Sequence, residues 1–323
     1  MKLPWLQADM EALGRSLDAD RLGHAPLLQG PPGIGKSALA QWLVARILCQ
    51  AAAAQRPCGV CRSCLLLQSG THPDLFLGAV PEDKTQITVD VIRDLCSGLQ
   101  LTPSIGRHRV GLIEPAERMN TNAANALLKT LEEPSPNSWL VLVTDRPDLL
   151  PATVRSRCQK LALRPPPRDE ALRWLQEECV GGERAQLELA LELSGGAPLK
   201  ARDLIQGDEL RVGLAVRSVL LDLAGGRPVS ASVAEEWATR PEQSWNWVAH
   251  WIRQWLGGQM GLSPAAGEEH LAEPALGHAR PGDLARAWQR ALAGRTLADS
   301  AIRADLLFGK WLLEWQSIFA DDR

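Results

Sequence analysis

The sequence predicts an α/β domain with a parallel sheet, followed by a small helical unit and an all-helical C-terminal domain. Over roughly the first 165 residues, short apolar segments alternate with helical patterns, as expected where helices cover a parallel sheet. Consecutive prolines at 165–167 end that alternation, because they can continue neither a helix nor a central strand. From about residue 208 onwards only helical patterns follow.

Five apolar segments are the expected strands. They are 26–29, 74–77, 109–113, 139–144 and 159–163. Between them, 37–49 and 122–133 carry the apolar spacing of a helix, and Pro134 ends the second one.

The helical remainder contains most of the tryptophans. The unit at 166–207 is interrupted by Gly181-Gly182 and by a turn at 194–198, and the segment 208–323 holds 8 of the 12 tryptophans. One helical face collects Trp245, Val248, Trp251, Ile252 and Trp255. Aromatic stripes pack in cores far more often than they stack on a cofactor, so we expect a helical core.

Composition excludes several protein classes. With 323 residues, 45% hydrophobic and 23% charged, the chain is neither disordered nor a disulfide-stapled miniprotein. No apolar run has the length of a membrane span, and the N-terminus lacks the apolar core of a signal peptide, so a cytoplasmic protein is expected. Because 35 basic residues are offset by 38 acidic ones, bulk electrostatics disfavours DNA binding by the chain alone.

The segment from Gly30 to Ser37 matches the phosphate-loop pattern G-x-x-x-x-G-K-[ST], between an expected strand and an expected helix. Its glycines let backbone N–H groups turn towards phosphate oxygens at a helix N-terminus. They are Gly30, Gly33 and Gly35. Lys36 would reach the β- and γ-phosphates, and Ser37 would hold Mg²⁺. We expect ATP with Mg²⁺ here; the alternative is a loop that keeps its shape without nucleotide.

The acidic motif after the third strand is incomplete. P-loop enzymes that hydrolyse nucleotide with this motif carry two carboxylates after that strand. One binds Mg²⁺, and the second polarises the attacking water. This sequence has Glu114-Pro115, so Glu114 can take the metal side, Pro115 supplies no carboxylate, and Glu117 lies almost a helical turn further on. We expect at most weak ATP hydrolysis by this chain.

Four of the seven cysteines follow the phosphate-loop helix with gaps of eight, two and two residues. They are Cys49, Cys58, Cys61 and Cys64. In a cytosolic chain this spacing favours thiolates around one tetrahedral ion over disulfides. Four thiolates leave no open position, so structural Zn²⁺ is expected, with unmetallated thiols as the alternative. The isolated Cys96, Cys158 and Cys179 are expected to be packed.

Arg157 lies in a Ser-Arg-Cys turn between a short helix opened by Pro151 and the last strand. A surface arginine is most often simply solvated. Its position beyond Thr144, the end of the strand that would flank the nucleotide, is where a neighbouring subunit could present its own site. A guanidinium entering that neighbour's γ-phosphate pocket stabilises transition-state charge, which is worth about 10³ to 10⁵ in rate.

Together these motifs resemble the bacterial clamp-loader subunits of DNA polymerase III, which belong to the AAA+ ATPases. The resemblance rests on their order: phosphate loop, four-cysteine insertion, Thr71-His-Pro-Asp74, Asn122-Ala-Ala-Asn-Ala-Leu-Leu-Lys-Thr-Leu-Glu-Glu-Pro134 and Ser156-Arg-Cys158. It covers about residues 20–165 with specific motifs, and the helical remainder only in layout and length.

Among these subunits the chain is most similar to the delta-prime type, with the motor type (gamma/tau) as the alternative. Three features favour delta-prime. They are Pro115, the end of the chain at Arg323, and Leu199-Lys200 where family ATPases carry a sensor arginine after a glycine pair. Lys200 does not replace a bidentate guanidinium. Thr144 matches the family's sensor-one position.

The resemblance implies an AAA+ domain at 1–165 with a zinc insertion at 49–64, a lid at 166–207 and a collar domain at 208–323. It implies that Arg157 is a trans-acting arginine finger for an adjacent motor subunit, in a complex that also contains a delta subunit. That complex would place a sliding clamp on primed DNA. Polymerase chemistry is not expected in this chain.

Two other functions stay open. An autonomous ATPase motor is favoured by the complete phosphate loop and opposed by Pro115 and Leu199. A zinc-dependent DNA-binding protein is the weaker alternative, because the chain lacks the basic surface that such modules need.

Overall fold

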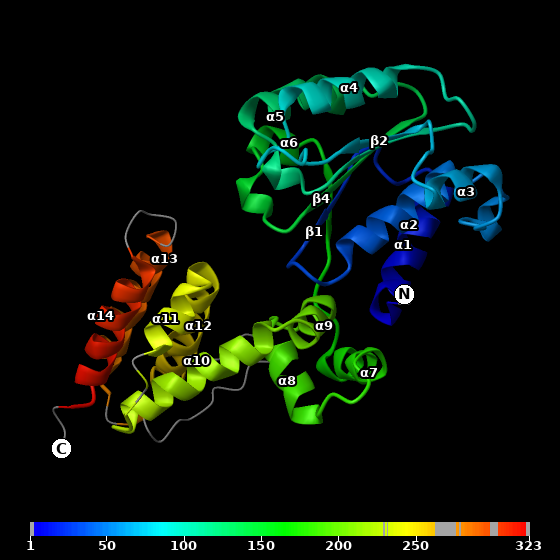
Figure 1. Cartoon of the computed structure of the whole chain (residues 1–323). Helices are drawn as coiled ribbons and strands as arrows, with labels where there is room; N and C mark the ends of the chain where they lie inside the picture. Colours follow the sequence, from blue (N-terminus) through cyan, green and yellow to red (C-terminus); the bar gives the residue numbers. More distant parts are fainter. Residues whose placement is uncertain are drawn as a thin grey trace. The chain divides into compact units, whose positions relative to one another are not determined.

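The computed structural model describes residues 3–228, 230, 232–261, 276–277, 279–297 and 303–320 (Figure 1). The chain forms two compact units, one comprising 1–171 and 197–200 and the other 172–196 and 201–323. A separate lid at 166–207 and collar at 208–323 stay predictions, and 321–323 lie outside the described residues. Within the described ranges, no helix combines the length and apolar character needed to cross a lipid bilayer.

The first unit is built around a five-stranded parallel sheet. Its strands are β1 (Pro26–Gln29), β2 (Leu75–Gly78), β3 (Arg109–Ile113), β4 (Ser138–Thr144) and β5 (Gln159–Ala162), in the order β2-β3-β4-β1-β5. The predicted bounds are confirmed for β1 and β3. The other three strands differ from prediction by one residue: β2 is shifted forward, β4 begins earlier and β5 ends earlier.

Helices cover both faces of this sheet. The α-helices of this part are α1 (Gln7–Asp18), α2 (Lys36–Leu48), α3 (Arg62–Gln68), α4 (Val89–Gln100), α5 (Thr121–Glu132) and α6 (Ala152–Arg155), and the 3-10 turns are Pro4–Leu6, Ala53–Gln55, Ala116–Arg118 and Pro147–Leu149. Helices α4 and α5 pack on one face, and α1 and α2 on the other (Figure 1). Successive strand residues serve opposite cores, since Leu27 belongs to the first and Leu28 to the second.

Local signals explain where helix α5 begins and ends. The Asn120 side chain accepts a hydrogen bond from the Ala123 amide at 2.8 Å, which satisfies one of the free N–H groups of the first turn. Pro134 follows the last turn, as expected from its missing amide. The predicted helices 37–49 and 122–133 are thus confirmed as α2 and α5, each beginning and ending one residue earlier.

The helices after β5 form the second unit, except that α7 and α9 cross the boundary between the units. They are α7 (Arg168–Glu178), α8 (Arg184–Leu193), α9 (Pro198–Gln206), α10 (Glu209–Ala224), α11 (Ser232–Ala238), α12 (Pro241–Gln259), α13 (Pro281–Thr296) and α14 (Ala304–Ser317).

The predicted apolar face of α12 is buried, which confirms the core interpretation of the tryptophans. Trp245 stacks on Phe308 with ring centroids 4.2 Å apart. The Trp251 indole donates to the Gly213 carbonyl at 2.8 Å, and the Trp315 indole donates to the Leu220 carbonyl at 2.9 Å. Each of these two rings therefore buries its apolar body while its N–H keeps a partner.

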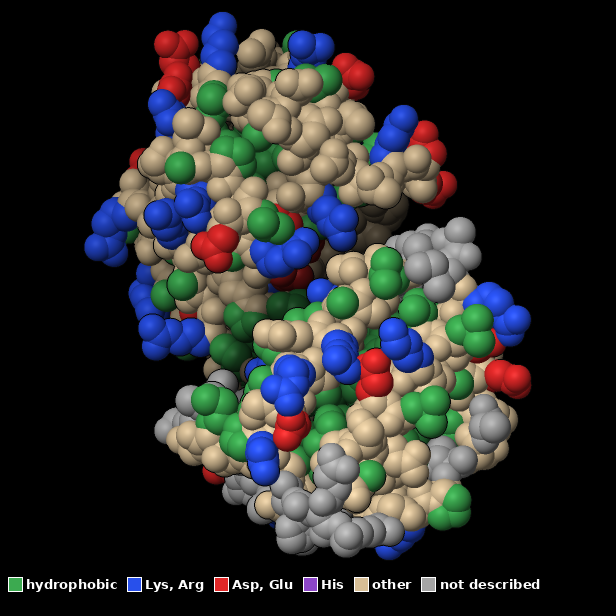
Figure 2. All heavy atoms as spheres, turned by 90° about the vertical axis from the view of Figure 1, so that its left-hand side faces the viewer, with side chains coloured by type: hydrophobic (Ala, Val, Ile, Leu, Met, Phe, Trp, Pro, Cys, Tyr) green, Lys and Arg blue, Asp and Glu red, His purple; other side chains and the backbone are tan. Residues whose placement is uncertain are grey.

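Charges of both signs share the surface. On the face drawn in Figure 2, lysine and arginine side chains are interspersed with acidic and uncharged ones. The whole sequence carries 35 basic and 38 acidic residues.

Two helical glycines give a matched test of packing in the second unit. A Cβ at Gly294 would lie 2.7 Å from the Trp245 ring, whereas a Cβ at Gly309 would meet only the Ala234 Cβ, at 4.0 Å. We expect Gly294→Ala to destabilise this unit by about 1–3 kcal/mol through overpacking. Gly309→Ala should leave stability unchanged or raise it by up to about 1 kcal/mol through helix propensity. Urea unfolding followed by tryptophan fluorescence measures both, and equal midpoints would contradict the packing described.

Candidate functional site

The predicted phosphate loop joins β1 to α2 in the structure. Gly30, Gly33 and Gly35 have φ of 155°, 81° and 95°, which side chains with a Cβ rarely adopt. Space is short as well, because a Cβ at Gly30 would lie 2.5 Å from the Leu163 carbonyl oxygen and one at Gly33 would lie 2.5 Å from the Lys200 Cβ. The loop therefore needs glycine at these positions for both its conformation and its packing.

Two hydrogen bonds from distant residues hold the loop in shape. The Trp5 indole donates to the Ile34 carbonyl at 2.9 Å, and the Leu199 amide donates to the Gly33 carbonyl at 3.0 Å. Leu199 and Lys200, where the resemblance would place a sensor arginine, thus pack on the loop itself. Sequence reasoning missed Trp5, whose role no motif signals.

Lys36 is buried and already has partners. Its Nζ donates to the Pro31 carbonyl at 2.6 Å and forms an ion pair with Asp145 Oδ1 at 2.6 Å. Asp145 directly follows Thr144, and Thr144 is paired with Gln29 at the end of β1. Sequence reasoning missed Asp145, although its place after that strand was a usable signal. A phosphate group arriving here would compete with this carboxylate for the ammonium group.

The side chains of Ser37 and Glu114 are in contact, as expected if both belong to one Mg²⁺ site. The Ser37 hydroxyl donates to Glu114 Oε1, and Glu114 directly follows β3. Pro115 comes next, and the Oε2 atom of Glu117 is buried with no hydrogen-bond partner in the described ranges. A hydroxyl and a carboxylate together can coordinate Mg²⁺.

Thr144 is fully buried at the end of β4. Its Oγ1 accepts a hydrogen bond from the Arg146 amide at 3.1 Å. The hydroxyl therefore shapes the turn that presents Asp145, and it keeps its own proton to donate.

Arg157 is exposed and lies away from these groups, in the turn between α6 and β5. Its Nε donates to Glu132 Oε1 at 2.7 Å, and one terminal nitrogen donates to the Thr153 carbonyl at 2.9 Å. Glu132 belongs to the Leu-Glu-Glu-Pro end of α5, so two segments of the family-like pattern meet here. Sequence reasoning did not assign Glu132 a role.

The four predicted cysteine ligands converge. Their sulfur atoms all lie within 4.8 Å of one another, and Cys49–Cys58, Cys49–Cys61 and Cys58–Cys64 are separated by 3.6, 3.9 and 4.0 Å. These separations are far longer than the roughly 2.05 Å of a disulfide bond, so the thiols are free. Gly59, with φ of 74°, makes the turn between the second and third ligands. The cluster can hold one tetrahedral metal ion.

Backbone amides lower the pKa values of these thiols, whereas burial raises them. Burial raises the pKa of Cys61, but the amides of Gln50 and Cys64 and the thiols of Cys64 and Cys58 together outweigh it and bring that pKa to about 6. Burial raises the pKa of Cys64 to about 12, and the neighbouring sulfur of Cys61 adds to the rise. The opposite pKa shifts of Cys61 and Cys64 indicate that these thiols influence one another's ionisation. We infer that the cluster does not hold four thiolates at neutral pH unless a cation is bound.

The Thr-His-Pro-Asp segment supports the cysteine insertion. Asp74 N–H donates to His72 Nδ1 at 3.1 Å, which leaves the proton on Nε2 to bond Ser63 Oγ at 2.7 Å. Ser63 then donates to the Leu48 carbonyl at 2.8 Å. Burial lowers the pKa of His72, although Asp74 opposes the shift, so the neutral ring is favoured. Helix α3 is thereby fastened to the end of α2.

Asp74 also fastens the loop before β3. Its carboxylate accepts the Ser104 and Ile105 amides at 2.7 and 2.9 Å and lies 3.4 Å from an Arg109 terminal nitrogen. This aspartate is fully buried, so its charge depends on those donors.

This chain is similar to known subunits of DNA polymerase III. The family described as DNA polymerase III, delta subunit, matches residues 6–167. The DNA polymerase III subunit delta′ of Pseudomonas aeruginosa is 41% identical over 254 residues, which are 77% of this chain and 75% of the relative. The subunit delta′ of Escherichia coli is 42% identical over 205 residues, which are 64% of this chain and 61% of the relative. The chain thus spans less than two thirds of that second relative.

One solved structure matches this chain at low identity. A DNA polymerase III gamma subunit-related protein of Thermotoga maritima has a TM-score of 0.48 and 14% identity, and the match covers 96% of this chain and 99% of that one.

Proposed function

The chain belongs to the family of DNA polymerase III delta-prime subunits, and on that premise we propose that it works as a clamp-loader subunit that lends Arg157 to the ATP site of a neighbouring subunit. Its partners are the motor subunits (gamma/tau) and a delta subunit, and it acts in the cytoplasm. Through the assembled complex it assists the ATP-dependent loading of a sliding clamp on primed DNA.

The position of Arg157 on the sheet carries this proposal. The phosphate loop follows the carboxyl end of β1, whereas Arg157 precedes the amino end of β5, the parallel neighbour of β1. These two points are separated by a four-residue strand, which is roughly 13 Å long. The guanidinium and the chain's own phosphate loop therefore lie at opposite ends of the parallel strands. Arg157 is thus available to the nucleotide of another chain.

The contacts of Arg157 support the same role. Glu132 and the Thr153 carbonyl hold the guanidinium at the surface, where the side chain is 37% exposed. A guanidinium is well suited to γ-phosphate oxygens because its planar N–H groups bind them in pairs. Only a surface contact has to be exchanged when a neighbour's triphosphate arrives.

The chain's own phosphate loop is suited to binding rather than turnover. Lys36, Ser37 and Glu114 provide contacts for ATP and Mg²⁺, while Pro115 leaves out the carboxylate that would polarise water. On this interpretation ATP is a structural ligand here, and hydrolysis takes place in the motor subunits.

The cysteine cluster is proposed to hold a structural Zn²⁺. With Zn–S bonds of about 2.3 Å, tetrahedral ligands are separated by roughly 3.8 Å. The shorter sulfur separations in the cluster run from 3.6 to 4.0 Å. Four thiolates would close the coordination sphere and leave no position for a reacting water.

An autonomous ATPase motor is the second candidate, and the contact between Ser37 and Glu114 favours it. That contact brings together the two groups expected to hold Mg²⁺. ATP turnover by the isolated chain separates the two candidates.

Removal of the guanidinium tests the finger directly. In a loader reconstituted with Arg157→Ala, we expect normal assembly and a drop of about tenfold or more in DNA-stimulated ATP hydrolysis. Arg155→Ala is the matched control, because Arg155 ends helix α6 two residues before Arg157 and contacts Pro147 and Asp148 instead. Equal hydrolysis by wild-type and Arg157→Ala complexes would rule the finger out.

The Lys36–Asp145 pair allows binding and turnover to be separated. In the isolated chain, Asp145→Ala should bind ATP several-fold more tightly, because phosphate no longer competes with a carboxylate for Lys36. Hydrolysis should stay at background, because Pro115 is unchanged. Asp148→Ala, at a nearby exposed position, is the control. Brisk turnover by either the variant or the wild-type chain would favour the autonomous motor instead.

Metal content tests the cysteine cluster. We expect about one zinc per purified chain by elemental analysis, well under one in Cys58→Ser, and an unchanged content in Cys96→Ser. Zinc retention should fall more steeply as the pH drops below about 6, because there the Cys61 thiolate takes up a proton in addition to Cys64. A wild-type chain without zinc, or a Cys58→Ser chain with full zinc, would exclude the site.

A further inference from the structure

A cavity lies beside the cysteine cluster, apart from the phosphate loop. It has a volume of about 500 Å³ and is formed by the end of α2, the start of the cysteine insertion and the loop before β3. Its polar lining includes Gln50, Arg56, Arg107 and His108. The Gln50 side chain donates to the Ile105 carbonyl at 3.0 Å and so ties the two walls together.

The charged groups in this cavity are all cationic or basic. No aspartate or glutamate is among its lining residues. Arg56 uses only its Nε, which donates to the Ala51 carbonyl at 2.6 Å, and Arg107 makes no hydrogen bond or ion pair within the described ranges. The nearby Asp18 is engaged by Arg46 at 2.6 Å. Two guanidinium groups therefore face the cavity with free N–H donors.

His108 adds an unpartnered polar atom. Its Nδ1 is buried and has no hydrogen-bond partner in the described ranges. Burial lowers the pKa of His108, and Arg56 and Arg107 lower it further, against the opposing effects of the Asn137 backbone and Asp20. The two arginines are thus close enough to act on the histidine, and the positive potential they create is not fully compensated.

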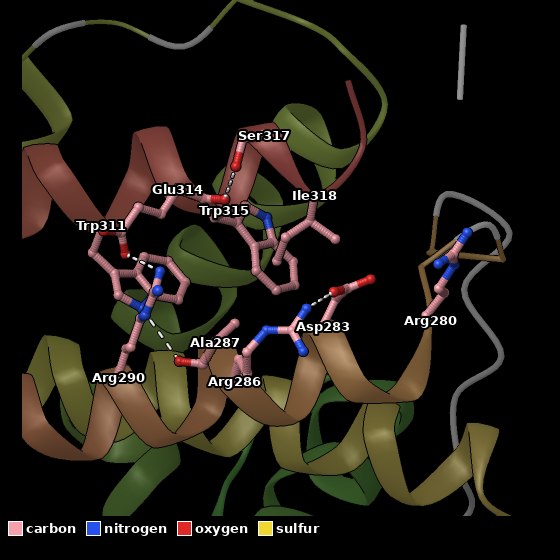
Figure 3. Close-up of a pocket in the computed structure, with 10 residues that line it drawn as sticks. All are labelled: Arg280, Asp283, Arg286, Ala287, Arg290, Trp311, Glu314, Trp315, Ser317 and Ile318. Carbon is pink, nitrogen blue, oxygen red and sulfur yellow. Dashed lines mark hydrogen bonds and ion pairs between the residues drawn. The ribbon is translucent and has the colours of Figure 1, made fainter. Parts of the chain in front are cut away.

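The cavity in the second unit provides a contrast. That cavity, of about 380 Å³ between α13 and α14, is also lined by arginines. There Arg286 is directed at Asp283, and Arg290 donates to Glu314 at 2.7 Å (Figure 3). Of the three arginines in that lining, Arg286 and Arg290 are neutralised within the site, so the presence of arginine alone does not make an anion site. The cavity beside the cysteine cluster differs because its cations have no acidic partner in its walls.

We infer that the cavity formed by Arg56, Arg107 and His108 binds the phosphate group of a small phosphorylated molecule, of the size of a nucleoside mono- or diphosphate. Guanidinium groups bind phosphate oxygens in pairs, and the volume lies in the range of small-molecule sites. A nucleic-acid strand is the less fitting ligand, because strand binding uses a groove that follows several successive phosphates, usually with stacking aromatic rings. This inference does not depend on the clamp-loader role.

Calorimetric titration with inorganic pyrophosphate tests it. The chain carries Lys36→Ala, so that the phosphate loop does not contribute, and zinc content is checked for every variant. We expect saturable binding that weakens at least about tenfold in Arg107→Gln. Arg62→Gln is the matched control, because Arg62 is exposed on α3 and does not line the cavity. Binding equal to that of the Lys36→Ala parent is expected for this control.

Three results would overturn the inference. They are an absence of saturable pyrophosphate binding, binding that Arg107→Gln leaves unchanged, and a ten-nucleotide single strand that binds more tightly than pyrophosphate with the same dependence on Arg107. The last result would assign the cavity to nucleic acid. Arg107 is exposed, so its replacement is not expected to disturb the fold, and Arg56→Gln provides a second variant with the same expected loss.

Discussion

The parallel pairing of β1 with β4 and β5 determines where the functional side chains lie. Pairing with β4 sets Thr144 beside Gln29, so that Asp145 reaches Lys36 in the loop that follows β1. Pairing with β5 brings the Leu163 carbonyl against Gly30 at the same edge of the sheet. The same pairing places Arg157, which precedes β5, at the amino ends of the strands, opposite the phosphate loop. One sheet thus separates a nucleotide-type loop from the arginine proposed for a neighbour.

Contacts from within the chain stabilise the phosphate loop. Trp5 and Leu199 donate hydrogen bonds to two of its carbonyl groups, and Asp145 forms an ion pair with its lysine. These contacts fix the shape of the loop through groups of the chain itself. Shape and turnover are therefore separate properties here, and a complete phosphate-loop pattern indicates only the first.

The sequence allows the local features to be predicted well. Strands β1 and β3 lie at their predicted bounds, and the cysteine spacing correctly places four sulfurs together, because each of these features depends on neighbours in the chain. The pairing of Ser37 with Glu114 also follows, since both come from motifs with known places on the sheet.

Other contacts between separate segments of the chain could not be predicted from the sequence. Trp5 with Ile34, Glu132 with Arg157, and Ser63 with His72 join residues 29, 25 and 9 positions apart. Such pairs depend on strand order and on the direction in which helices leave the sheet. Asp74 illustrates the difference: its family-like segment is recognisable, yet its role as the buried acceptor for the loop before β3 requires the folded chain.

Two ion pairs show why the proposed finger is freer than the chain's own lysine. Arg157 and Glu132 are 37% and 49% exposed, and exposed pairs of this kind contribute only about 0.2–1 kcal/mol. Lys36 is 3% exposed, and separating it from Asp145 without a replacement would leave a buried charge unpaired. In the proposed function, a triphosphate would therefore draw Arg157 away at little cost, whereas at Lys36 it would have to take the place of the carboxylate. The structure thus contains one exposed and weakly paired cation, Arg157, and one buried and firmly paired cation, Lys36.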